Sequence, residues 1–170
     1  MSKMLFPKMA VSNIRKNKKL YVPYIITAIF TVMMFFMNIS IVKNKNVAAM
    51  RGGQNVVVLL QVALVVSFIF SAVFLFYTNS FLMKRRTKEI GLYNILGMEK
   101  KHISLMMLFE NVIITIISLI AGIVFGIIFS RLMFLVLMKL IKADSVPAFV
   151  ISTNAVVVTI IYFISIFAVI

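Results

Sequence analysis

The sequence predicts an all-α membrane protein with four transmembrane helices, and three observations support this class. Hydrophobic residues make up 63% of the 170 positions and the mean hydropathy is +1.12, whereas the apolar share of soluble domains is roughly 45–50%. Four stretches without a charged residue reach or nearly reach the roughly 20 residues that a helix needs to cross a bilayer. The alternating pattern of a membrane barrel strand is absent, so helices are the structures expected to cross the lipid.

The first element is a basic amphipathic leader, residues 1–19, and residues 20–170 form the transmembrane domain. The first uncharged stretch is longer than the apolar core of a secretory signal peptide, so we expect it to be retained as a span. A cytoplasmic loop covers residues 84–102. The four spans are predicted at about 20–42, 56–83, 103–139 and 152–170.

The net charge is +14, from 18 Lys/Arg against 4 Asp/Glu, and the basic residues lie mainly between the spans. Such a charge can indicate nucleic-acid binding, but basic residues that flank spans also set their orientation, and this explanation fits their positions. Twelve of them lie in the leader and in residues 84–101, against five in residues 43–55 and 139–151. We therefore expect a multi-pass protein of the cell membrane with a cytoplasmic N-terminus and no nucleic-acid partner.

The cytoplasmic loop contains a mostly apolar segment, EIGLYNILGM, at residues 89–98. On a helix its apolar side chains form one arc, opposite Gly91, Asn94 and Gly97. Thr87 is predicted to cap the start of a short amphipathic helix, and Gly97 to follow its end. Such a helix either lies on the lipid surface or docks into a groove of a cytoplasmic partner. The arc consists of Leu92, Tyr93, Ile95 and Leu96.

The longer motif around this segment, KRRTKEIGLYNILGMEKKHI, resembles the cytoplasmic motif of FtsX-like permeases. The leader, FPKMAVSNIRKNKKLYVPYI, is similar to the amphipathic N-terminal segment of the same family. Together with GLYNILGM these stretches are most similar to the bacitracin-export type of permease. The MacB and lipoprotein-release branches differ, because they place a large extracytoplasmic domain where this sequence has only residues 43–55.

This resemblance implies a permease subunit of a type VII ABC transporter, driven by a separate cytoplasmic ATPase dimer. The loop helix would be the coupling helix that the ATPase contacts. Permeases of the bacitracin type also contact a sensor histidine kinase and confer resistance to cell-wall-active peptides. They have about ten spans, so we expect this sequence, which ends after its fourth, to be a truncated form. The implied coupling residues are Glu89, Ile90, Gly91, Leu92, Tyr93, Leu96, Gly97 and Met98.

The third span is predicted to run from about residue 102 to 139, which is roughly 57 Å of helix and longer than a bilayer is thick. Glu110 and Arg131 bracket its uncharged part and are expected at opposite interfaces, as anchors or in local ion pairs. The resemblance implies that Glu110 pairs with a basic residue near the inner face, since members of the family often carry a Glu at the start of this span. Small residues recur every fourth position along this span and predict a tight helix–helix contact, inside this bundle or with a second permease half. They are Ser118, Gly122, Gly126 and Ser130.

The sequence offers no candidate for catalysis or metal binding. It lacks a Gly-rich phosphate loop, so ATP would be held by a partner and no cofactor is bound directly. The four acidic residues are scattered, His102 stands alone, and cysteine is absent. Polar residues in or beside the spans, such as Asn38, Gln61 and Asn79, are expected to form hydrogen bonds between helices.

Two other function classes remain open. An FtsX-like protein can relay ATPase motion to a kinase or an outer enzyme without transport. A small basic protein can also permeabilise membranes, although an ordered cytoplasmic docking segment is not needed for that.

Overall fold

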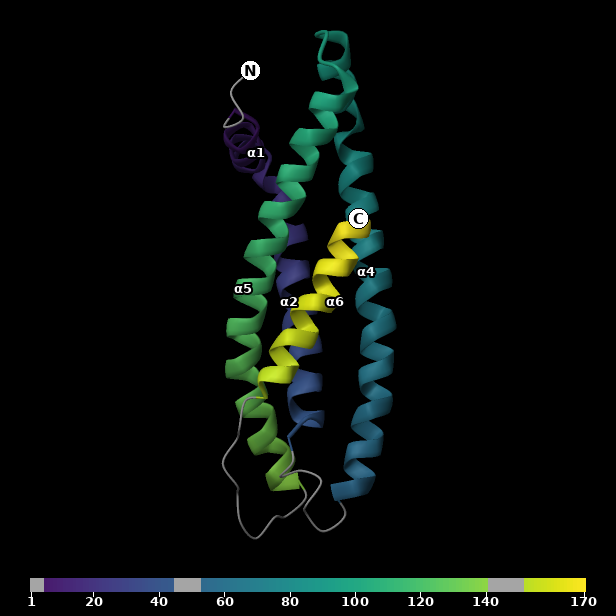
Figure 1. Ribbon diagram of the computed structural model, residues 1–170, viewed down its shortest axis with the longest axis vertical. Coiled ribbons are helices and arrows are strands. Elements are labelled where there is room, and N and C mark those ends of the chain that lie inside the picture. Colours follow the sequence, from purple (N-terminus) through teal and green to yellow (C-terminus); the bar gives the residue numbers. More distant parts are fainter. Residues whose placement is uncertain (1–4, 45–52, 141–151) are drawn as a thin grey trace.

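The computed structural model describes residues 5–44, 53–140 and 152–170, and these residues form helices joined by short turns (Figure 1). The predicted outer loops, 43–55 and 139–151, lie mostly outside the described residues. The helices are α1 (Leu5–Lys16), α2 (Lys18–Val42), α4 (Gly53–Ile95), α5 (Lys100–Leu140) and α6 (Thr153–Val169).

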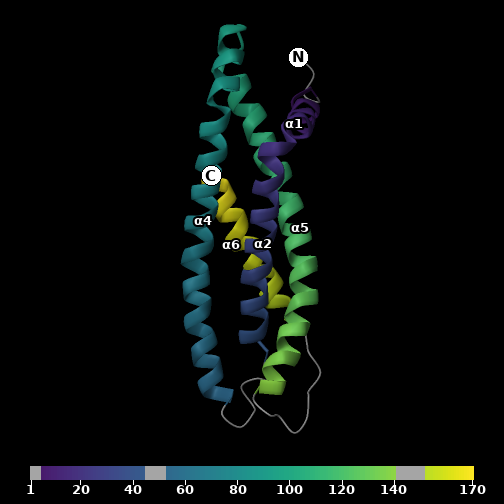
Figure 2. The ribbon, with the colours of Figure 1, turned by 180° about the vertical axis from the view of Figure 1, so that it is seen from behind.

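The long helices run side by side, with α2 and α6 between α4 and α5 in both views (Figures 1 and 2). The turn between α4 and α5 projects beyond the other elements at one end of the bundle. The short α1 lies obliquely at the same end, where it packs against α5. The N-terminal helix α1 therefore lies at the end of the bundle that carries the α4–α5 turn.

Among the described residues, three helices are long and apolar enough to cross a membrane, namely Lys18–Val42, Gln54–Ile95 and Lys100–Leu140. The fourth predicted span corresponds to α6, a shorter apolar helix of 17 residues. The 41 residues of α5 exceed the predicted length of the third span.

The prediction of a separate short helix that begins at Thr87 is wrong. Helix α4 continues without interruption to Ile95, and the Thr87 hydroxyl donates to the Met83 carbonyl oxygen of the same helix at 3.2 Å. Residues 84–89, directly after Met83, are mainly Lys, Arg and Glu, which are good helix formers, and residues 84–95 contain no proline to end the helix. The predicted coupling segment is therefore the last turns of α4, collinear with its apolar part.

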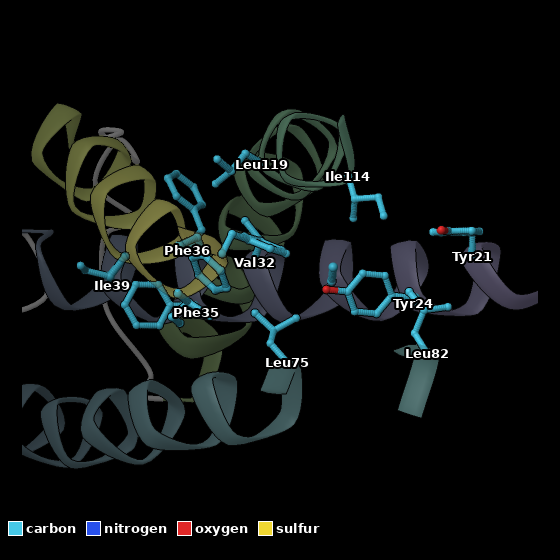
Figure 3. Packing of buried hydrophobic residues seen from close by; sticks show 14 of the residues in the cluster. Tyr21, Tyr24, Val32, Phe35, Phe36, Ile39, Leu75, Leu82, Ile114 and Leu119 are labelled. Atoms are coloured by element: carbon cyan, nitrogen blue, oxygen red, sulfur yellow. The ribbon is translucent and has the colours of Figure 1, made fainter. Parts of the chain in front are cut away.

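The core forms around α2 (Figure 3). Val32 and Phe36 of α2 are fully buried, and Leu119 of α5 and Leu75 of α4 belong to the same cluster. On the side of α6, the ring of Phe35 stacks on Tyr162 with centroids 4.8 Å apart. Because α2 contacts α4, α5 and α6, it holds the bundle together.

Polar side chains add contacts between the helices. Asn38 of α2 donates to Ser67 of α4 at 3.0 Å, which confirms the prediction for this residue. Asn79 borders a hollow described below, whereas Gln61 is exposed.

Helix α4 presents an exposed apolar surface along most of its length. Leu59, Phe70 and Tyr77 are among its many exposed large side chains. Of the α4 side chains that the structure describes, only four are buried, and they form one stripe along the helix. These are Ser71, Leu75, Leu82 and Arg86.

Candidate functional site

A buried ion pair lies near the end of the bundle that carries the α4–α5 turn. Arg86 of α4 is 1% exposed and Glu110 of α5 is 3% exposed. The Arg86 guanidinium donates to both carboxylate oxygens, from Nη1 to Oε2 and from Nη2 to Oε1, the latter at 3.3 Å. This forked geometry matches the planar guanidinium to the planar carboxylate.

Two further donors complete the surroundings of the carboxylate. Asn13 of α1 donates from Nδ2 to Oε1 at 2.7 Å, and the Tyr21 hydroxyl of α2 donates to Oε2 at 2.6 Å. The Arg86 guanidinium also lies over the Tyr21 ring, 5.2 Å from its centroid. We call Asn13, Tyr21, Arg86 and Glu110 the Glu110 cluster. Four helices are thus joined through one carboxylate.

A second acidic residue extends the cluster towards solvent. Glu89, one α-helical turn after Arg86, lies 3.6 Å from Arg86 Nε and accepts a hydrogen bond from Asn17 Nδ2 at 3.0 Å. Asn17 is the residue between α1 and α2, where its φ of −100° and ψ of 35° interrupt the helical path. We call Asn17 and its two neighbouring helix ends the elbow. Glu89 therefore connects the end of α4 to the elbow.

Sequence analysis predicted that Glu110 is an anchor or pairs locally, and the structure shows an ion pair with Arg86. The roles of Asn13, Tyr21 and Arg86 were missed. A signal for Arg86 was present, because Arg86 lies 12 residues before Met98 and Glu110 lies 12 residues after it. In a helical hairpin that turns near Met98, these two positions face each other. Asn13 and Tyr21 belong to another part of the sequence, and no comparable spacing indicates them.

The turn between α4 and α5 forms a defined helix cap. Gly97 has a φ of 83°, its N–H donates to the Asn94 carbonyl oxygen at 3.2 Å, and the Met98 N–H donates to the Tyr93 carbonyl oxygen at 3.1 Å. This pair of hydrogen bonds is the Schellman motif, in which glycine adopts the left-handed conformation. The prediction that Gly97 follows the helix end is confirmed.

The cap at Gly97 can be tested by mutation. We expect Gly97→Ala to cost about 1 kcal/mol, because a side chain at positive φ is strained. Gly91→Ala is the matched control: Gly91 lies within α4, nothing lies within 4 Å of an added Cβ, and alanine favours a helix. Amide hydrogen exchange at Met98 should accelerate in the first variant and not in the second. Equal exchange in both would contradict the role of Gly97.

The other predicted coupling residues surround this cap at the projecting end. We call residues 92–98 the hairpin tip. Leu92, Ile95 and Leu96 are 59%, 84% and 71% exposed, so most of the predicted apolar arc is exposed. Tyr93 and Met98 are half-buried, as are Ile90 and Glu89 nearer to the bundle, and Gly91 is exposed.

The small residues of α5 are buried, and the two glycines among them face α2. Ser118 and Ser130 are fully buried. A Cβ added to Gly122 would lie 2.6 Å from Val32 Cβ, and one added to Gly126 would lie 2.7 Å from Phe36 Cδ1. Glycine at these two positions therefore permits the close approach of α5 to α2. Arg131 lies beside this surface and is exposed.

A hollow of about 510 Å³ opens between α4 and α5 next to the Glu110 cluster. Leu82 and Ile90 of α4 and Met107 of α5 border it, as do Arg86 and Glu110. Helices α4 and α5 make little direct contact, since α2 and α6 lie between them over most of their length. Near the hairpin tip, the ion pair therefore spans a region where apolar packing between α4 and α5 is sparse.

The described residues form helices, and three of these are long and apolar enough to cross a membrane, which indicates a multi-pass membrane protein. A family model described as FtsX-like permease C-terminal matches residues 61–170, more than half of the sequence. The chain belongs to the FtsX-like permease family.

Three relatives cover most of this chain. The ABC transporter permease YvcS of Bacillus subtilis is 32% identical over 160 residues, 93% of this chain and 25% of the relative. The bacitracin export permease protein BceB of Bacillus subtilis is 30% identical over 162 residues, 94% of this chain and 25% of the relative. BceB of Halalkalibacterium halodurans is 29% identical over 153 residues, 90% of this chain and 24% of the relative. The chain thus spans about a quarter of the length of these relatives.

Proposed function

We propose that this chain acts within the permease subunit of a type VII ABC transporter, in which a separate cytoplasmic ATPase dimer moves the membrane helices. The observation that carries the proposal is that the hairpin tip projects from the bundle with its apolar side chains exposed. Three large aliphatic side chains exposed on one helix end are suited to a groove on a partner, since anchors of this kind bind by burying apolar area.

The distribution of charges supports one orientation of the bundle in the membrane. The excess of Lys and Arg in the leader and around the hairpin tip favours the cytoplasmic side for both. The tip would then face the compartment that contains ATP. In this arrangement the ATPase binds and hydrolyses ATP, the chain itself holds no cofactor, and the exposed apolar surface of α4 faces lipid or further membrane helices.

We extend the proposal to the substrate class. Two of the relatives are named bacitracin export permeases, which supports a role in resistance to peptide antibiotics that act on the cell wall. A sensor histidine kinase is a further proposed partner, as the resemblance implies.

The docking surface is tested by adding charge to it. We expect Leu92→Glu or Ile95→Glu to abolish co-purification with the ATPase encoded beside this protein, because a carboxylate in an apolar groove loses its hydration without gaining a partner. The same variants should lose resistance to bacitracin in cells. The measurements are affinity co-purification from membranes and the minimal inhibitory concentration of bacitracin.

Thr87→Glu is the matched control. Thr87 is exposed on the same helix, and its hydroxyl bonds only within that helix among the described contacts. It lies five residues before Leu92 and hence on a different face of α4. We expect this variant to bind the ATPase like the unmodified protein. Retained binding by both Leu92→Glu and Ile95→Glu would reject the hairpin tip as the docking site.

A further inference from the structure

We infer that the Glu110 cluster is a rigid joint, which transmits a displacement of the hairpin tip to the elbow between α1 and α2. The inference rests on the proposed function, because it concerns how motion leaves the docking site. It assigns Asn13, Tyr21, Arg86 and Glu110 as positioning residues for coupling.

The first step concerns α4. Arg86 is the buried α4 side chain nearest to the tip among those that the structure describes; the next buried one towards the membrane is Leu82. A force applied at the tip therefore meets the Arg86–Glu110 pair before it meets the apolar core. The hollow beside this pair leaves the inner flank of α4 with little other support.

The second step concerns the elbow. Asn13 lies four residues before Asn17 and Tyr21 lies four residues after it, and they donate to opposite oxygens of the same carboxylate. The carboxylate thus holds both arms of the elbow. Asn17 itself donates to Glu89, so the elbow is tied to α4 at a second point.

The third step concerns stiffness. The strength of a hydrogen bond falls steeply with misalignment, so a forked ion pair and two further hydrogen bonds lose most of their energy when the partners are displaced. A buried charge that loses its partner is also strongly unfavourable. The end of α4 and the elbow should consequently move as one body, and α1 should follow the tip.

The experiment measures the distance between α1 and α4 with spin labels. The chain contains no cysteine, so Val11→Cys and Lys88→Cys provide unique labelling sites on exposed positions of the two helices. In the otherwise unmodified protein we expect one narrow distance distribution, unchanged when the bound ATPase is given a non-hydrolysable ATP analogue. With Glu110→Gln we expect a broader distribution that shifts with nucleotide, while co-purification with the ATPase is retained.

A milder variant keeps the test valid if Glu110→Gln does not fold. Asn13→Ala removes the tie between α1 and the carboxylate, together with the 3.4 Å hydrogen bond that Asn13 Oδ1 accepts from Asn17 Nδ2, and leaves Arg86 paired. Ser12→Ala, at an exposed neighbour, is its matched control. We expect broadening for Asn13→Ala alone. A distribution that stays narrow in both Glu110→Gln and Asn13→Ala would overturn the joint, as would a nucleotide-dependent shift in the unmodified protein.

The outcome separates the joint from the proposed function. If the unmodified protein never binds the ATPase, the proposed function fails. The comparison of Glu110→Gln and Asn13→Ala with the unmodified chain in lipid nanodiscs, without ATPase, still shows whether the cluster fixes α1 against α4.

Discussion

Replacing Glu110 with alanine should destabilise the bundle by about 3–5 kcal/mol, the usual effect of leaving one member of a buried ion pair without its partner. The variant removes the acceptor of Arg86, Asn13 and Tyr21 at once, and the first of these is a charge that is only 1% exposed. Unfolding of the purified protein in mixed micelles, titrated with sodium dodecyl sulfate and followed by circular dichroism, measures the loss.

The matched control for this prediction is Arg131→Ala. Arg131 is a charged residue of the same helix, but its side chain is exposed, so its removal should change the free energy of unfolding by less than about 1 kcal/mol. A loss for Glu110→Ala no larger than that for Arg131→Ala would mean that the cluster contributes little to stability.

Enlarging Gly122 should separate α5 from α2. An added Cβ would lie 2.6 Å from both Cβ and Cγ1 of Val32 and 3.1 Å from the Ile29 carbonyl oxygen. Val32 Cβ is attached to the backbone and cannot rotate away, so the helices themselves must shift. We expect about 1–3 kcal/mol for Gly122→Ala, as for other overpacked cores, and a larger loss for Gly122→Leu.

The same unfolding titration measures this effect. Val124→Leu is the control, because Val124 lies two residues along α5 and is 51% exposed. Added volume there points away from α2 and should be neutral. If Gly122→Leu unfolds at the same detergent fraction as Val124→Leu, close packing at Gly122 does not stabilise the bundle.

The sequence was sufficient for the class and the main helices, since hydropathy and charge placement alone distinguish membrane helices from their connections. It was not sufficient for the boundary at Thr87. The periodicity after Met83 fits a helix, but it does not tell whether that helix is separate or continues the span. Helix propensity and the absence of a breaker were better guides, because a helix extends until something ends it.

The candidate site was predictable only in part. Gly97 has a local conformational signature, so sequence reasoning located the cap correctly. Glu110 stood out as an acidic residue beside an apolar run, and the 12-residue spacing about Met98 could have indicated Arg86 as its partner. Asn13 and Tyr21 could not be found in this way, because their positions depend on the angle at which the chain bends at Asn17 between α1 and α2, which is a tertiary property.

The unbroken course of α4 also determines how far from the bilayer a partner would rest. From Met83, the last residue of the uncharged stretch, to Ile95, the last residue of α4, is 12 residues, or about 18 Å of helix. The headgroup layer on one side of a bilayer is only about 5–8 Å thick. A helix of this length that stands perpendicular to the membrane would hold a bound partner beyond the headgroups. A soluble partner would therefore need no affinity for lipid, and the lipid composition of the leaflet would have little influence on how long it stays bound.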